Sequence, residues 1–146
     1  MKTLVDYFKH EITLQSDFEW AKDMEIVDVK PGYVEGLFHS DAKRHANIRG
    51  GLHGAVSLAF ADTLMGMAAR SLGKMSATVE LSGNYVKAGV AGETIRGVVK
   101  TQHAGRTLIT MTTHIYNEED ELIHMAKATF FCLKPYELPD LPWTLE

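Results

Sequence analysis

Hydrophobic positions follow two different spacings along the 146-residue chain. Near the start, apolar side chains recur at helical intervals and predict a short amphipathic helix over residues 3–13: Leu4, Val5, Phe8 and Ile12. Residues 24–29 and 33–39 have extended patterns, and the turn signal Lys30-Pro31-Gly32 separates them. The first forty residues are therefore expected to form a helix followed by a β-hairpin.

A long helix is predicted over residues 53–72, after a glycine-ended loop at 41–51. It should end before Gly73, a residue suited to a helix C-terminus. The segment is apolar nearly all round, which is typical of a buried helix. Many of its residues are small enough to let a curved sheet approach closely: Gly54, Ala55, Ser57, Ala59, Ala61, Gly66, Ala68 and Ala69.

Beyond the helix the apolar spacing changes to a period of two. Residues 77–85 alternate like a half-buried strand, and three further strands are expected at 94–102, 107–116 and 122–133, as a four-strand meander. The prediction is an α+β fold, with an antiparallel sheet of five to six strands packed on one long helix. We expect a single domain, with residues 1–23 as an N-terminal helical segment, residues 24–134 as the core and residues 135–146 as an irregular, proline-containing tail.

Composition excludes several classes of protein. Hydrophobic residues make up 45% and charged residues 23% of the chain, which favours a packed core over disorder. The net charge of -4 argues against a nucleic-acid partner. The single cysteine, Cys132, leaves no internal disulfide, and no segment has the character of a signal peptide or a membrane span. A cytoplasmic location is expected.

Asp62 is the first candidate for chemistry, because an unpaired carboxylate inside an apolar helix is costly. His53 precedes it by nine residues, which places the two about half a turn out of phase, on opposite sides of one helix. Two chains related by a twofold axis could bring the Asp62 of one to the His53 end of the other. There the free N–H groups of the helix start, Gly54 among them, could polarise a carbonyl oxygen, while Asp62 acts as a base or a nucleophile.

The spacing of Asn47, Gly50, His53, Gly54 and Asp62 resembles the signature of hot-dog-fold acyl-CoA thioesterases, and most closely the phenylacetate-degradation (PaaI-like) branch. Further matching segments extend the resemblance over residues 24–134: 77–81, 92–93, 105–107 and 129–131.

This resemblance implies a hot-dog dimer, often paired into a tetramer, that hydrolyses an acyl-CoA without a metal or a cofactor, coenzyme A being part of the substrate. Asp62 would be the catalytic carboxylate and the Gly54 N–H would polarise the thioester carbonyl. Asn47 of the partner chain would position the carbonyl or the water, His53 would lie beside the thioester, and Thr78 would orient the water.

Three further residues are candidates for the substrate site. Met65 would line the acyl pocket or the core, and the resemblance places a nucleotide or phosphate contact near Arg106. Two positions depart from the family. In place of Gly83 the family often has a bulkier residue, and in place of Ala55 it often has a second glycine after His-Gly. A glycine at position 83 would enlarge the pocket or bend the strand.

Each candidate also has a structural explanation. His53 could cap the helix, Asp62 could be a buried acid bonded to a strand, and Asn47 could form a turn. Thr78 could face solvent and Arg106 could be a solvated turn charge. The histidines form no ligand-spaced metal motif, and His114 and His124 are expected as a surface pair across a hairpin.

Two other functions fit the same fold. One is a non-catalytic protein that binds acyl thioesters. The other is a hot-dog dehydratase acting on a β-hydroxyacyl thioester, which would pair a histidine with a carboxylate at a different motif spacing.

Overall fold

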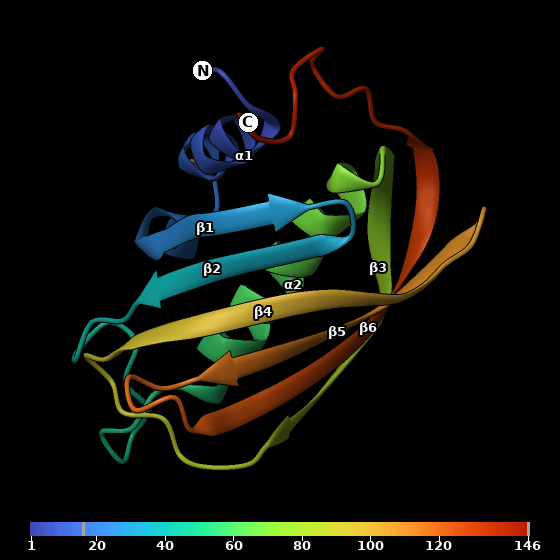
Figure 1. The fold of residues 1–146 in the computed structure, drawn as a ribbon. Coiled ribbons are helices and arrows are strands. Elements are labelled where there is room, and N and C mark those ends of the chain that lie inside the picture. The colour runs from blue at the N-terminus through green and yellow to red at the C-terminus, as the bar shows by residue number, and fades with distance from the viewer. Residues whose placement is uncertain (16, 146) are drawn as a thin grey trace.

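The computed structural model describes residues 1–15 and 17–145. In chain order they form α1 (Leu4–Glu11), 3-10 turns at Ile12–Leu14 and Glu19–Asp23, β1 (Met24–Lys30), β2 (Tyr33–His39), α2 (Gly54–Ser71), β3 (Lys74–Tyr85), β4 (Thr94–Ala104), β5 (Leu108–Tyr116) and β6 (Leu122–Pro135). The predicted α+β class, with six antiparallel strands on one long helix, is confirmed. In Figure 1 the strands curve around α2.

Short-range signals define α1 and its position. The Thr3 hydroxyl accepts a hydrogen bond from the Asp6 N–H, and the Asp6 carboxylate accepts one from the Thr3 N–H, which makes a capping box. Phe8 is fully buried and stacks on Trp143 at 6.4 Å between ring centroids. The Leu4 N–H also donates a hydrogen bond of 2.7 Å to the Pro142 carbonyl, so the C-terminal tail covers α1 (Figure 1).

The strand order is β1-β2-β4-β5-β6-β3, so the expected four-strand meander after the helix is wrong. β4 pairs with β2, and β3 lies at the sheet edge beside β6. Gly36 of β2 faces Gly97 of β4, and a Cβ at either would come within 2.8 Å of the Leu64 side chain of α2. These two glycines let the middle of the sheet approach the helix. The alternating pattern of a strand does not predict such a contact between segments that are far apart in the sequence.

Burial differs from the expectation on one side of the molecule. β3, one of the two edge strands, is mostly exposed rather than half-buried. α2 is not buried all round either. One stripe along it is only partly covered: Ala55 is exposed, and Ala59, Asp62, Gly66 and Arg70 are half-buried. No helix among the described residues is long and apolar enough to cross a membrane.

Candidate functional site

Asp62 lies half-buried on the open stripe of α2, beside β3. The Thr78 hydroxyl donates a hydrogen bond of 2.8 Å to Asp62 Oδ1. The carboxylate is therefore neither deeply buried nor unpartnered, and one oxygen is held in a fixed direction. Both residues line a groove of about 270 Å³, whose other walls include Thr63, Gly66, Arg70, Met75, Ser76 and Phe130.

His53 caps the N-terminus of α2. Its Nδ1 accepts a hydrogen bond of 3.1 Å from the Ala55 N–H, as its structural explanation predicted. This leaves Nε2 as the nitrogen that carries hydrogen in the neutral ring. Among the described residues, no group accepts a hydrogen bond from the Gly54 N–H. The helix start thus presents a free donor beside an exposed imidazole.

Gly54 lies tightly against Tyr85. The Tyr85 hydroxyl donates a hydrogen bond of 2.7 Å to the Gly54 carbonyl, and a Cβ at Gly54 would be 3.1 Å from the tyrosine ring. The first peptide of the helix is therefore held by the end of β3.

Asn47 shapes the loop before the helix. Its Oδ1 accepts hydrogen bonds from the Arg49 N–H at 2.9 Å and the Gly51 N–H at 3.0 Å. The turn also needs Gly50, whose φ of +83° suits glycine. The Asn47 amide nitrogen donates a long hydrogen bond of 3.5 Å to the Leu52 carbonyl, so one of its two hydrogens is left for a ligand.

The helix start opens onto a second hollow, a cleft of about 580 Å³ lined by Asn47, Gly54, Ser57, Tyr85, Lys87 and His124, among others. The described residues that line this cleft are separate from those that line the Asp62 groove. Gly54 and Asp62 are eight residues apart on α2, or about 12 Å along its axis. One chain thus holds the two halves of the predicted site in different hollows.

Comparison with known proteins identifies the family. The model of the thioesterase superfamily matches residues 49–124, just over half of the chain. The chain belongs to the thioesterase superfamily.

Relatives and solved structures agree with this assignment. Over 109 residues the chain is 29% identical to a protein of Archaeoglobus fulgidus named "Putative esterase", covering 75% of this chain and 70% of that protein. A hypothetical thioesterase of Streptococcus pneumoniae, solved with coenzyme A, is 27% identical, with a TM-score of 0.76 and coverage of 80% of this chain and 93% of that one. Two variants of that protein, also solved, have an aspartate and a threonine sixteen positions apart each replaced by alanine.

The fold is that of PaaI-like hot-dog thioesterases. The PaaI protein of Escherichia coli superposes with a TM-score of 0.81 over 93% of this chain and 99% of that one, at 15% identity. The resemblance drawn from the sequence is confirmed at the level of fold and family.

His124 of this thioesterase was not recognised as a candidate from its sequence. It is 1% exposed rather than part of a surface pair, and it pairs across the hairpin with Ile115, while His114 pairs with Met125. Its ring stacks on Tyr85 at 4.3 Å, and both ring nitrogens lack a hydrogen-bond partner among the described residues. Burial lowers the pKa of His124, so the ring is neutral where it lines the cleft.

Gly83 houses this ring. A Cβ at Gly83 would lie 2.3 Å from His124 Nε2, so the glycine leaves room that the histidine occupies. The space is filled within the chain rather than added to the pocket. The bulkier residue expected from the family at position 83 was the signal that could have drawn attention to His124.

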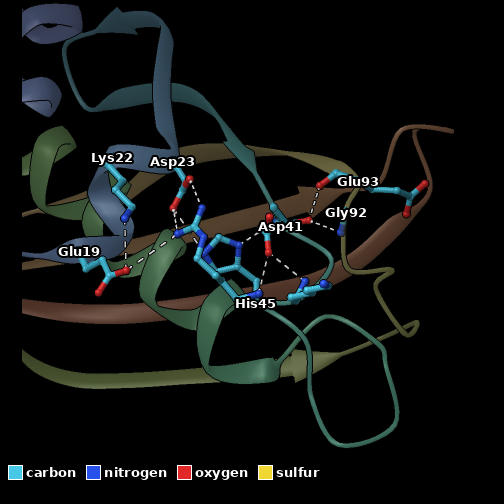
Figure 2. A network of polar contacts seen from close by, with 10 residues as sticks. Glu19, Lys22, Asp23, Asp41, His45, Gly92 and Glu93 are labelled. Atoms are coloured by element: carbon cyan, nitrogen blue, oxygen red, sulfur yellow. Dashed lines mark hydrogen bonds and ion pairs between the residues drawn. The ribbon is translucent and has the colours of Figure 1, made fainter.

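A second buried histidine anchors the loop that carries Asn47 (Figure 2). His45 is fully buried, and its Nδ1 accepts a hydrogen bond of 2.7 Å from the Asp41 N–H. Its backbone carbonyl accepts one of 2.8 Å from the His53 N–H, which ties the loop to the helix cap. Burial lowers the pKa of His45, so the neutral ring can accept this bond. No short motif in the sequence indicates such an anchor.

The Asp23 carboxylate lies beside this anchor. Arg44 donates hydrogen bonds to both Asp23 oxygens, at 2.9 and 3.1 Å, and the same contact lowers the pKa of Asp23. His45 Nε2 is 3.4 Å from Asp23 (Figure 2). The loop is thereby fixed to the segment that leads into β1.

Two predicted substrate contacts lie away from the helix start. Met65 is fully buried in the hydrophobic core of its own chain. Arg106 is exposed in the β4–β5 turn, and the neighbouring Thr107 carbonyl accepts a hydrogen bond of 2.7 Å from the Cys132 N–H. Since Cys132 pairs with Ser76, the turn lies at the same end of the sheet as the Asp62 groove. Contact of either residue with substrate stays a prediction.

Proposed function

We propose that this thioesterase hydrolyses an acyl-CoA to the free acid and coenzyme A, at a site shared by two copies of the chain. The observation that carries the proposal is the hydrogen-bonded pair of Asp62 and Thr78. The two residues are sixteen positions apart, as are the aspartate and threonine replaced in the pneumococcal thioesterase. That protein was solved with coenzyme A, which supports the choice of substrate.

The roles follow from the chemistry of each group. The thioester carbonyl accepts a hydrogen bond from the Gly54 N–H, where negative charge develops during attack. Asp62 takes a proton from the attacking water, or attacks the carbonyl carbon itself to form an anhydride that water then opens. Thr78 occupies one carboxylate oxygen and leaves the other for this step. The sulfur leaves as the coenzyme A thiolate and gains a proton.

The need for two copies follows from distance. The thioester carbonyl oxygen must accept a hydrogen bond from the Gly54 N–H. At the same time, the carbonyl carbon must lie close to Asp62, or to the water that Asp62 activates. Within one chain the two residues are about 12 Å apart along α2. A twofold pairing through the open stripe of α2 and the exposed β3 would bring Asp62 and Thr78 of one copy to Asn47, His53 and Gly54 of the other.

The test of the chemistry is release of free thiol from a panel of acyl-CoA esters. Asp62→Asn is expected to lower turnover by about 10² or more, with unchanged circular dichroism and unchanged mass by light scattering. Full activity in this variant would remove Asp62 from the mechanism. Tight acyl-CoA binding without hydrolysis by the unmutated protein would indicate a binding protein instead. A product that keeps its thioester, by mass spectrometry, would indicate a dehydratase.

Gly54 allows a matched pair of variants. It is the first residue of α2, where proline is well tolerated but carries no N–H. His53 already has φ -65° and ψ 130°, which a following proline accepts. Gly54→Pro should therefore lower turnover by about 10² to 10³. The control, Gly54→Ala, adds a similar contact with Tyr85 but keeps the donor.

The shared site is tested by mixing inactive chains. A mixed dimer of the Asp62→Asn and Gly54→Pro chains has one site with both groups intact. Random mixing should restore about a quarter of the activity of the unmutated dimer. If both groups act within one chain, no mixture regains activity.

A further inference from the structure

Gly66 is an unexplained glycine in the middle of α2. Glycine costs about 1 kcal/mol relative to alanine inside a helix, and at Gly66 no packing within the chain requires it. Apart from the adjacent backbone of its own helix, a Cβ at this position would meet no atom within 4 Å. The open space above Gly66 belongs to the groove that also contains Asp62.

The groove follows one face of α2. Asp62, Gly66 and Arg70 are four residues apart in turn, so they lie in a row along the helix. The row extends about 12 Å from Asp62 to Arg70. Met75 and Phe130 lie opposite on the sheet side. The groove thus has a carboxylate and a guanidinium about two helical turns apart, with Met75 and Phe130 as apolar side chains and Gln15, Thr63, Ser76 and Thr78 as polar ones in its lining.

Arg70 has no ion pair among the residues that the structure describes. It is half-buried, and its guanidinium lies 5.8 Å from the ring centroid of Tyr136. A position in the last turn of α2 accounts for a positive charge. The position of Arg70 near the helix end does not explain why Gly66, one turn earlier, faces open space. An unpaired guanidinium in a groove is suited to a carboxylate, which it binds with two parallel hydrogen bonds.

We propose that this groove binds the acyl chain of a half-thioester of a dicarboxylic acid. The thioester reacts near Asp62, the methylene chain passes over Gly66 and against Met75 and Phe130, and the terminal carboxylate binds Arg70. The inference rests on the proposed function, because it takes Asp62 as the end where the thioester is hydrolysed.

The first test compares adipyl-CoA with hexanoyl-CoA, which have the same chain length and differ in the terminal carboxylate. The unmutated protein should have a kcat/KM about tenfold or more higher for adipyl-CoA, as expected for a charge-assisted hydrogen bond. Arg70→Gln should abolish this preference, because it should lower kcat/KM for adipyl-CoA about tenfold or more relative to hexanoyl-CoA. Lys100→Gln, at an exposed position of β4, is the control and should keep the preference.

Coenzyme A offers phosphates as another anion for Arg70, and N-acetylcysteamine thioesters remove them. The adipyl preference and its loss in Arg70→Gln should persist with these short thioesters. If Arg70→Gln instead weakens both coenzyme A esters equally and neither N-acetylcysteamine ester, Arg70 binds phosphate and the proposal is wrong. Equal rates for adipyl-CoA and hexanoyl-CoA would also overturn it, while leaving the thioesterase function intact. Failure to hydrolyse any thioester would overturn the proposed function itself.

Gly66→Ala tests the path between the two ends. Its methyl group should lower kcat/KM for both six-carbon esters much more than for acetyl-CoA, without lowering the melting temperature. Light scattering on the same variant distinguishes a contact between copies. A changed assembly would assign the open glycine to that contact and would contradict its role in the groove.

Discussion

Gly83→Ala should destabilise the protein mainly through contact of the new methyl group with the His124 ring. The new Cβ would lie 2.3 Å from His124 Nε2, and 3.2 Å from both His124 Cε1 and Leu58 Cδ1. The imidazole cannot easily move away, because it is 1% exposed and stacks on Tyr85 at 4.3 Å. Overpacking of this kind typically costs about 1 to 3 kcal/mol.

A double-mutant cycle with His124→Ala isolates this contact. Once the ring is gone, the methyl group at position 83 has space, and replacing glycine by alanine gains about 0.4 to 1 kcal/mol through the unfolded chain. Gly83→Ala should therefore be neutral or stabilising in that background. The coupling free energy between the two positions is expected to be about 2 kcal/mol or more.

The measurement is urea unfolding followed by circular dichroism, at one fixed protein concentration because self-association changes apparent stability. A cost of about 2 kcal/mol corresponds to a fall of roughly 4 to 8 °C in melting temperature. Ser82→Ala, at the neighbouring exposed position of β3, should have little effect. Additive effects of Gly83→Ala and His124→Ala, within about 0.5 kcal/mol, would refute the claim that the glycine houses the ring.

Two further predictions concern histidines. Burial lowers the pKa of His124 in the folded protein. As the pH falls below about 6.5, the unfolded chain therefore binds a proton at this residue before the folded chain does. The free energy of unfolding should be greatest above that pH and should fall below it, by up to about 1.4 kcal/mol per pH unit for this residue. The free energy of unfolding, measured in urea between pH 7.5 and 5.5, should change less steeply with pH in His124→Leu. An unchanged pH dependence would contradict the lowered pKa of His124. The pKa of His45 is also lowered by burial, and this residue accounts for pH dependence that remains. His53→Ala removes the cap of α2 and should cost about 0.5 to 2 kcal/mol, whereas His53→Asn keeps a capping side chain and should cost less. If His53→Asn is stable but inactive in the thiol-release assay, His53 contributes to chemistry beyond capping.

The sequence predicted individual elements well, because their signals are local. The helix begins after the capping His53 and ends before Gly73, as its caps indicated. The hairpin of β1 and β2 follows from the turn at Pro31 and Gly32. Strand partners were predicted less well. The pairing of β2 with β4 brings Gly36 opposite Gly97 over Leu64, and that fit involves three distant segments.

The residues of the candidate site also differ in whether local sequence predicts them. The spacing from Asn47 to Asp62 lies within sixteen residues and was recognisable as a family signature. The bond from Thr78 to Asp62 depends on β3 passing along the open side of α2. His45 and His124 were missed because their burial is produced by elements far from them in sequence. A histidine in an alternating strand has the same local pattern whether or not another element covers it.

Not all of the small residues of α2 serve the close approach of the sheet that the sequence suggested. Four of them are buried, as expected: Ser57, Ala61, Ala68 and Ala69. On the same side, the large helix residues Phe60 and Leu64 meet glycines of the sheet. Ala55, Ala59 and Gly66 lie on the open stripe instead. Their size therefore leaves space for something outside the chain. On the proposed function, the two alanines would face the α2 of a second copy, while Gly66, beyond Asp62, would face the acyl chain. The carboxylate that first appeared anomalous would then mark the boundary between the two.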